Sequence, residues 1–384
     1  MIKSLKRIKW KYYINYIVIG VVILAFSFRV FNNNAEELDR SVTSLMSNIG
    51  ISIILATSLS MVVGFLGELS LGHAGFMCVG AYIGGKIATV FSEFIESELL
   101  VFIISLIIGG LAAMLCGFII GLPALRLRGD YLAIVTLAFG EIVRIIFLNS
   151  GGVFGDTSGF KTPRYDRKVF FLIIFVIVLL TLFVIQNLIR SKHGRAITSI
   201  RDSEIAAKAT GINVTKYKLI VFAISALFAG IAGVLHSFNT PTRIYADTFD
   251  YNYSIEILVM VVLGGMGSIN GSIIVATLIT FINTKLQTEL EGGLAVLKNL
   301  IYALILILIV VYNNAPKLKP FRDKYNFKNL FGLLSNKEKS PEVHRDDEAK
   351  WDRVPTKIQM DEVLSVDLQI SSPYTPDKGK KEGK

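Results

Sequence analysis

Long apolar runs, each near the length of a membrane-spanning helix, are the feature that most limits how this chain can fold. About 20 apolar residues cross a bilayer core as a helix, which also satisfies its own backbone hydrogen bonds. With 52% hydrophobic and 18% charged residues, the composition exceeds what a soluble core of this length buries. The sequence predicts an all-α, polytopic membrane protein of about ten transmembrane helices, near residues 14–31, 43–66, 71–91, 99–121, 131–148, 169–189, 217–238, 248–263, 271–286 and 299–313.

The apolar stretch 254–282 is interrupted by GGMGSINGS, and it fits either one long kinked helix or two shorter helices. Cytoplasmic loops carry the excess of Lys and Arg, so the charges help to choose. The first 13 residues hold five basic residues and no acid, whereas the loops 32–42 and 92–98 are acidic. Alternation from a cytoplasmic N-terminus returns the basic C-terminal segment to the cytoplasm only with two helices. We therefore expect two helices joined on the cytoplasmic side.

One loop departs from this charge pattern. The loop 149–168 carries four basic residues on the side predicted to lie outside: Lys161, Arg164, Arg167 and Lys168. The other loops agree with the alternation, so we accept the exception.

The predicted organisation has three parts. Residues 1–13 form a basic cytoplasmic N-terminus, and residues 14–313 form the transmembrane domain with a cytoplasmic loop at 190–216. In residues 314–384, 15 Lys and Arg nearly balance 12 Asp and Glu, and no long apolar period survives. Such a segment buries too little surface to offset chain entropy, so we expect a disordered cytoplasmic tail.

Motifs for catalysis are lacking in the sequence. The text GAYIGGKI, from Gly80 to Ile87, comes close to a phosphate-binding loop, but Ile87 replaces the hydroxyl that would hold magnesium, and the text lies in an apolar span. The four histidines are scattered, without metal-ligand spacing or a Ser-His-acid set. We expect no catalytic residue, no metal site and no cofactor bound by the chain itself. No nucleic acid is expected as a partner.

The central loop reads SKHGRAITSIRDSEIAAKATGINVTKYK and predicts a short capped helix. Asp202 is suited to cap its start, residues 203–210 fill about two turns, and Gly211 supplies a left-handed stop. Two turns are not stable alone in water, so one face should contact the protein and the other a partner. The alternative is a basic loop resting on anionic lipid headgroups.

The text EIAAKATG, from Glu204 to Gly211, resembles the loop by which ABC import permeases present a coupling helix to their ATPase subunits. Its glycine falls one residue later than in the commonest form of that pattern. Four longer segments, in the same order, resemble the M-type permease of branched-chain amino acid importers: LGELSLGHAGFMCVGAY at 66–82, GLPALRLRGDYLAIVTLAFGEIVR at 121–144, the segment 193–233 and SIEILVMVVLGGMGSINGS at 254–272. The resemblance covers roughly residues 43–313 and omits the tail.

The resemblance implies a fold similar to the ribose-permease class, with about ten helices per subunit, in a bacterial or archaeal inner membrane. It also implies a second, H-type permease subunit, two ATP-binding subunits inside and a substrate-binding protein outside, with ATP and magnesium used by the ATP-binding subunits. In that scheme five residues form the docking element: Arg201, Asp202, Glu204, Ala207 and Gly211.

Polar residues within apolar spans are candidates for the substrate pathway, because polarity is costly in lipid. Glu141 and Arg144 are three residues apart and share a helix face. His73, Glu256 and Gly264 lie near glycine-rich breaks at residues 72–75 and 264–271. Each has a structural alternative: an ion pair, a packing histidine, or close packing of helices, as expected for Gly117 and Gly121. Glu68 is a further candidate that fits equally well at the cytoplasmic interface.

Alternative functions stay open from the sequence. Similar permeases serve urea and short amides, other amino acids, or sugars and nucleosides, and no side-chain pattern fixes the small-molecule substrate. A proton-coupled secondary transporter would use Glu141, Glu256 or His73 as its proton carrier, although it would not need the capped central loop. A membrane scaffold or receptor would transport nothing.

Overall fold

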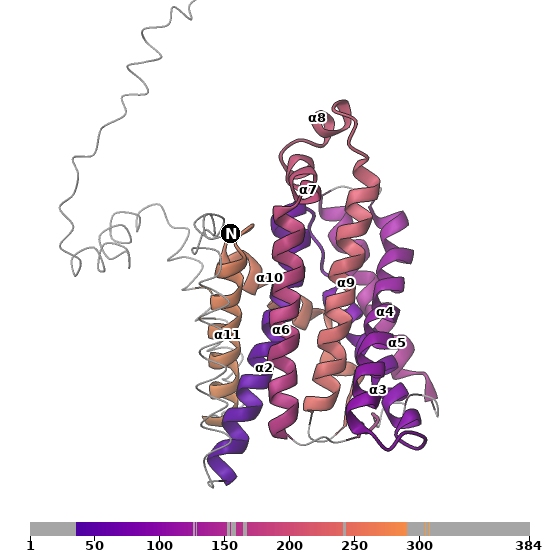
Figure 1. Ribbon diagram of the computed structural model, residues 1–384. Helices are drawn as coiled ribbons and strands as arrows, with labels where there is room; N and C mark the ends of the chain where they lie inside the picture. The colour runs from indigo at the N-terminus through magenta and orange to yellow at the C-terminus, as the bar shows by residue number, and fades with distance from the viewer. Residues whose placement is uncertain are drawn as a thin grey trace, which may run out of the picture. The chain divides into compact units, whose positions relative to one another are not determined.

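The computed structural model describes residues 36–289, except positions 126, 128, 152–153, 155–158, 164–166 and 241–242, together with Leu304 and Ile307. Helices dominate this part of the chain (Figure 1). The elements are α2 (Glu36–Ser60), the π-helical turn η3 (Met61–Leu66), α3 (His73–Phe91), α4 (Glu98–Ala124), α5 (Asp130–Leu148), α6 (Arg167–Arg190), α7 (Lys192–Asp202), α8 (Glu204–Ala209), α9 (Val214–Asn239), the 3-10 turn η6 (Ala246–Phe249), α10 (Tyr251–Gly264) and α11 (Ile269–Glu289). The described residues form no strand, only an isolated bridge between Phe160 and Ile244. For these residues the all-α prediction is confirmed.

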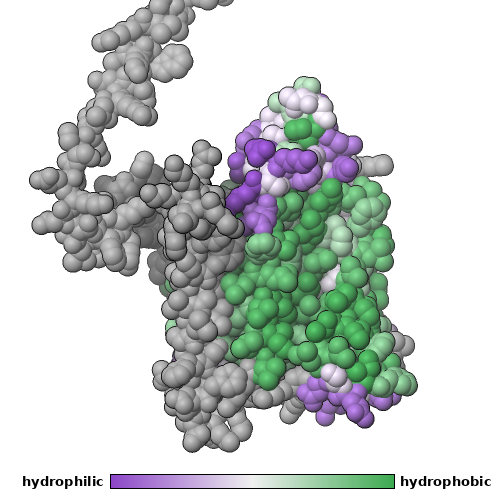
Figure 2. Space-filling view, viewed as in Figure 1, coloured by the Kyte–Doolittle hydropathy of each residue, from purple (hydrophilic) through white to green (hydrophobic). Residues whose placement is uncertain are grey.

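Six described helices are long and apolar enough to cross a membrane: α2 with η3, α3, α4, α5, α6 and α9. Helices α10 and α11 are apolar over shorter lengths. Figure 2 shows a hydrophobic band on the visible face, with hydrophilic residues at the end that carries α7 and α8 and at the opposite end. Apolar side chains exposed in this way match a lipid environment. The prediction of a multi-pass membrane protein is confirmed.

Several predictions fall outside the described residues. They concern the N-terminus 1–13, the run 14–31, all but two positions of the run 299–313, and the tail 314–384. The total of about ten transmembrane helices and the three-part organisation therefore stay predictions.

The stretch 254–282 forms two helices, as the charge pattern predicted, and the single kinked helix is wrong. Helix α10 ends at Gly264 and α11 begins at Ile269. The turn is tight, because a Cβ added to Gly264 would lie 2.5 Å from the backbone nitrogen of Ser272. The glycine-rich break therefore separates two helices and brings their backbones close together at Gly264.

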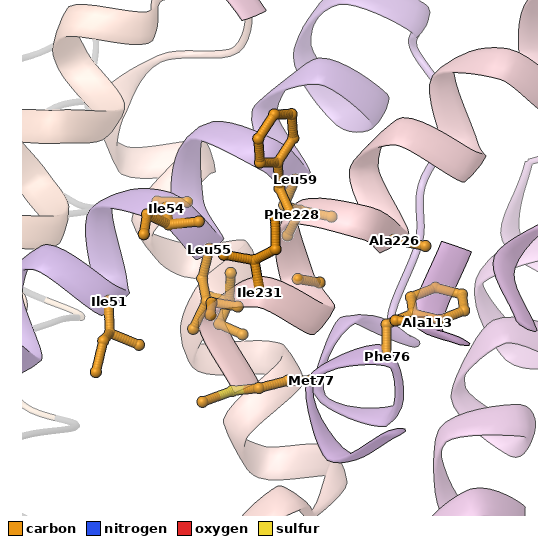
Figure 3. Packing of buried hydrophobic residues seen from close by; sticks show 14 of the residues in the cluster. Ile51, Ile54, Leu55, Leu59, Phe76, Met77, Ala113, Ala226, Phe228 and Ile231 are labelled. Atoms are coloured by element: carbon orange, nitrogen blue, oxygen red, sulfur yellow. The ribbon is translucent and has the colours of Figure 1, made fainter. Parts of the chain in front are cut away.

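Helices α3, α4 and α9 pack closely against one another through glycines. A Cβ added to Gly80 of α3 would collide with the carbonyl group of Gly230 in α9, and one added to Gly117 of α4 would lie 2.5 Å from the Cβ of Ala226. Figure 3 shows buried residues of this core, including Phe76 and Ala226. Small residues let helices approach closely in membranes. Gly80 and Gly84 of GAYIGGKI thus belong to a helix-packing surface, as Gly117 does.

An interruption separates α2 from α3. The helix passes through the π-helical turn η3 and stops at Gly67, which has a φ of 80° in the left-handed region. Residues 67–72 are not helical, and α3 begins at His73. Here, too, the glycines allow close packing, because Cβ atoms added to Gly72 and Gly75 would each lie 2.6 Å from backbone atoms of α5. The break predicted at residues 72–75 lies earlier, at residues 67–72, because residues 73–75 belong to the first turn of α3.

The loop 149–168 lies at the end of α9 opposite to the central loop. The hydroxyl of Thr162 donates a hydrogen bond of 2.8 Å to the carbonyl oxygen of Ser237, near the C-terminal end of α9. The central loop instead leads into the N-terminal end of the same helix. The predicted alternation of loops therefore holds here, although this loop breaks the charge pattern.

Candidate functional site

The central loop folds into two short helices, α7 and α8, where the sequence predicted one (Figure 1). The hydroxyl of Ser191 caps α7 by accepting a hydrogen bond of 3.1 Å from the backbone nitrogen of His193. Ile197 and Ile200 of α7 are 2% and 4% exposed. These two side chains, three residues apart, form a buried apolar face that holds α7 on the protein. A serine suited to cap a helix, Ser191, followed by isoleucines three residues apart, Ile197 and Ile200, was the sequence pattern that could have predicted α7.

Helix α8 is capped by Ser203, and the prediction of Asp202 as its cap is wrong. Helix α7 continues through Asp202, so the first residue with the extended backbone that a cap requires is Ser203, at φ −161° and ψ 108°. The Ser203 hydroxyl accepts a hydrogen bond of 3.3 Å from the backbone nitrogen of Ala206. The carboxylate of Asp202 instead pairs with Arg201 at 2.9 Å.

The predicted stop of this helix at Gly211 is confirmed. Gly211 has a φ of 83°, and its backbone nitrogen donates a hydrogen bond of 3.0 Å to the carbonyl oxygen of Lys208. The nitrogen of Ile212 donates one of 3.0 Å to the carbonyl oxygen of Ala207. This pair of bonds is the Schellman arrangement that closes a helix with a left-handed residue.

The surface of α8 is divided between a buried side and an exposed side. Ala207 is 3% exposed, whereas the large apolar side chain of Ile205 is 79% exposed. Glu204 pairs with Lys208 one turn later at 2.7 Å. The hydrogen bond from Lys208, assisted by the charge of Lys218, holds the pKa of the Glu204 carboxyl below its usual value. The helix thus keeps an ionised carboxylate next to an exposed isoleucine, at the far end of a hydrophilic loop.

A buried lysine joins α8 to the interruption between α2 and α3. The side chain of Lys218, in the first turns of α9, is 4% exposed, and its ammonium forms an ion pair with Glu68. It also pairs with Glu204 at 3.3 Å. Of the two options that the sequence left for Glu68, this position favours the interface beside the central loop. Lys218 was not among the predicted functional residues, because one lysine in a basic loop gives no sign that it is buried.

Arg201 forms a second link between the central loop and the same interruption. Its Nη1 atom donates a hydrogen bond of 3.2 Å to the carbonyl oxygen of Gly64 in η3. A Cβ added to Gly67 would lie 2.8 Å from Cγ of Arg201, and one added to Gly267, between α10 and α11, would lie 3.5 Å from its Nη1 atom. Three segments far apart in the sequence therefore meet at Arg201. The α10–α11 turn lies on the side of the central loop, as predicted.

Glu141 and Arg144 form the predicted pair on one face of α5, with Nε of Arg144 2.9 Å from the carboxylate. Arg144 also contacts Asp247 at 2.7 Å, and Glu141 accepts a hydrogen bond of 2.9 Å from the backbone nitrogen of Tyr251. The side chains of Glu141 and Arg144 are 23% and 22% exposed, and that of Asp247 is 72% exposed. The charges therefore connect α5 to the start of α10. Asp247 was not among the predicted functional residues, because it lies 103 residues from Arg144 and no sequence pattern links the two.

The remaining pathway candidates all have structural partners. His73 is buried, with its Nε2 atom 2.8 Å from the hydroxyl of Ser58. The carboxylate of Glu256 accepts a hydrogen bond of 3.0 Å from Asn283 in α11. Gly264 lies in the tight turn that follows α10. Of the pathway candidates, Glu141 and Arg144 contact each other directly. Among the described residues, no group of His, Cys, Asp and Glu is arranged to hold a metal ion.

The fold and this loop define a class: a multi-pass helical membrane protein in which two short helices outside the apolar band contact a break in the spanning helices. The chain belongs to the family described as branched-chain amino acid transport system / permease component, which matches residues 41–310. Proteins of this family are transport permeases.

Curated relatives agree with the family. The chain is 37% identical over 290 residues to the high-affinity branched-chain amino acid transport system permease protein LivM of Escherichia coli strain K12, covering 64% of this chain and 65% of that protein. It is 30% identical over 257 residues to the probable branched-chain amino acid transport permease protein LivM of Methanocaldococcus jannaschii, covering 58% and 74%. It is 25% identical over 316 residues to the ribose import permease protein RbsC of E. coli K12, covering 78% and 91%. The chain thus spans just under two thirds of the E. coli LivM protein, and no solved structure matches it.

Proposed function

We propose that this chain is the M-type permease subunit of an ABC importer for branched-chain amino acids. The observation that carries the proposal is the pair of helices α7 and α8, which presents an exposed apolar residue, Ile205, while contacting a break in the membrane helices. A two-turn helix exposed in this way gains stability from a partner surface. The names of the LivM relatives support the substrate class.

The complete complex would contain this subunit with about ten transmembrane helices, an H-type permease subunit, two ATP-binding subunits and an extracytoplasmic substrate-binding protein. It would lie in a bacterial or archaeal inner membrane, surrounded by lipid, with both termini of this chain in the cytoplasm. ATP and magnesium would be used by the ATP-binding subunits. This chain would bind no cofactor and catalyse no reaction of its own.

In this mechanism α8 and its flanks form the docking element for an ATP-binding subunit. Ile205 supplies apolar contact area, Ser203 and Gly211 fix the two ends of the helix, and Ala207 packs against the chain itself. Arg201 spans from the loop to the membrane break. Closure of the ATP-binding subunits would displace α8, and the spanning helices would follow through these contacts.

Substrate would pass along a face of this subunit that is polar without being fully exposed. The cluster of partly exposed Glu141 and Arg144 with exposed Asp247 is the best candidate, because such charges are costly against lipid and tolerable in a water-filled path. We assign no substrate contact to His73, Glu256 or Gly264, whose partners hold the helices together.

The test is a substitution that removes the exposed apolar side chain of Ile205 and leaves the fold unchanged. Ile205→Asp should abolish co-purification of the ATP-binding subunits and ATP-driven uptake of leucine, because a charge would replace the apolar contact. Expression and membrane insertion should be unchanged, since Ile205 is 79% exposed. The matched control, Thr215→Asp, adds the same charge at an exposed position in the first turn of α9, where acids are favourable. Normal binding and uptake in Ile205→Asp would rule out α8 as the docking element.

A proton-coupled transporter makes the opposite prediction about energy sources. Uptake by the importer should survive collapse of the proton gradient and stop when ATP is depleted. Uptake that follows the proton gradient instead would refute the proposed function.

A further inference from the structure

We propose that Lys218 is a positioning residue that transmits movement of α8 to the break between α2 and α3. The proposal rests on the proposed docking role of α8. It adds a particular route, Glu204 to Lys218 to Glu68, by which docking outside the membrane reaches the spanning helices.

The burial of this lysine is the first argument. Lys218 is 3% exposed as a whole residue, although lysine is rarely buried without a partner. It belongs to α9 and contacts one carboxylate from α8 and another from the segment after η3. A lysine has three donors on one ammonium group, so a single side chain can hold both carboxylates. Lys218 thus connects two segments that have no ion pair with each other among the described residues.

The position of Glu68 is the second argument. It lies in the non-helical residues 67–72, which lead directly into α3. At the start of α3, His73 contacts the hydroxyl of Ser58 in α2, and the backbone nitrogen of Ala74 donates a hydrogen bond of 3.0 Å to the hydroxyl of Ser254 in α10. A shift of Glu68 would therefore act on the segment that positions α3 against two other helices.

The energetics favour a role in coupling over one in stability. A buried ion pair contributes little net stability, because desolvation of both charges offsets their attraction, whereas removing one partner leaves an unpaired buried charge. Replacing Lys218 and Glu68 together by neutral side chains should therefore preserve assembly better than replacing Lys218 alone. If the pair exists for coupling, the double variant should assemble and still fail to transmit movement.

The experiment uses the complete complex of both permease subunits, ATP-binding subunits and binding protein, reconstituted in liposomes. The variants are Lys218→Met with Glu68→Gln, and Glu68→Gln alone, which removes the membrane end of the route while Lys218 keeps Glu204. The matched control is Lys216→Met, which removes an exposed lysine two residues away on α9. Three quantities are measured: co-purified ATP-binding subunits, ATP hydrolysis with and without loaded binding protein, and leucine imported per ATP hydrolysed.

We expect both test variants to retain ATP-binding subunits and basal hydrolysis. Leucine imported per ATP should fall about tenfold, within the range typical of coupling between sites, and the control should match the wild type. A merely structural role would change the amount of complex and leave this ratio unchanged.

Two outcomes would overturn the inference. One is wild-type import per ATP in Glu68→Gln, which decides the matter even if the double variant does not fold. The other is a double variant that regains import together with assembly. Failure of the unmodified chain to bind any ATP-binding subunit would instead refute the proposed function, so the two failures are distinguishable.

Discussion

Replacing Gly211 by valine should weaken the docking of ATP-binding subunits through backbone strain alone. Gly211 has a φ of 83°, and apart from its chain neighbours no heavy atom lies within 4 Å of a Cβ added at this position. Valine would therefore meet no steric obstacle, and the whole effect comes from the left-handed conformation, which costs about 1–2 kcal/mol for a residue with a Cβ. A β-branched residue is especially disfavoured there.

The expected size of the effect follows from this strain. The Schellman bonds to Lys208 and Ala207 hold the end of α8, and a strained residue would open them in the free protein. Binding would then have to restore the strained conformation, so the dissociation constant of the ATP-binding subunit should rise by about 5- to 30-fold. Import should fall correspondingly when the ATP-binding subunits are limiting.

The assay is a titration of ATP-binding subunits onto the permease pair in nanodiscs. Gly211→Asn is the matched control, because asparagine tolerates the left-handed region better than valine and should recover most of the affinity. Equal affinity in the wild type and both variants would refute the reasoning, since the helix stop would then have no part in docking.

Two further predictions concern the membrane domain. Neutralising Glu141 or Arg144 alone should destabilise the protein by about 1–3 kcal/mol, as measured by thermal unfolding in detergent. This is less than the loss for a fully buried pair, because both side chains are about one fifth exposed. Neutralising both residues should restore much of the lost stability. Gly80→Ala should destabilise it by about 1–3 kcal/mol or more in the same measurement, because the new Cβ would collide with the carbonyl group of Gly230 and force α3 away from α9.

For each of these two predictions, one result would show that the residues have a different role from the one expected. If the Glu141 and Arg144 double variant is as stable as the wild type yet imports no leucine, the pair belongs to the substrate pathway. For Gly80, the control is Leu115→Ala on α4, which is 60% exposed and should change stability by less than about 0.5 kcal/mol. Equal stability of both alanine variants would contradict the close packing of α3 and α9.

Local patterns were enough to predict much of the membrane domain. Hydrophobic runs fixed where the described spanning helices lie, because a helix in lipid must be apolar over its whole length. Glycine predicted two helix boundaries correctly. Gly211 ends α8 in the left-handed conformation, and the segment around Gly264 separates α10 from α11. The i, i+3 spacing of Glu141 and Arg144 likewise predicted their ion pair.

Local patterns did not predict which of two neighbouring residues caps α8. Asp202 and Ser203 are both suitable caps, and the choice depended on how far α7 extends. That extent is set by the burial of Ile197 and Ile200 against the rest of the protein, which is a tertiary contact.

By itself, the sequence determined the class of protein, the described spanning helices and the exposed capped helix of the central loop, since each follows from the solvent and the local backbone. Only the tertiary structure decided which charges meet. Lys218 pairs with a carboxylate 150 residues away, and Arg144 with one 103 residues away. Such partners depend on how the helices pack, because charges pair only when they lie close together in space. The spacing of two residues along the chain does not show whether packing brings them into contact.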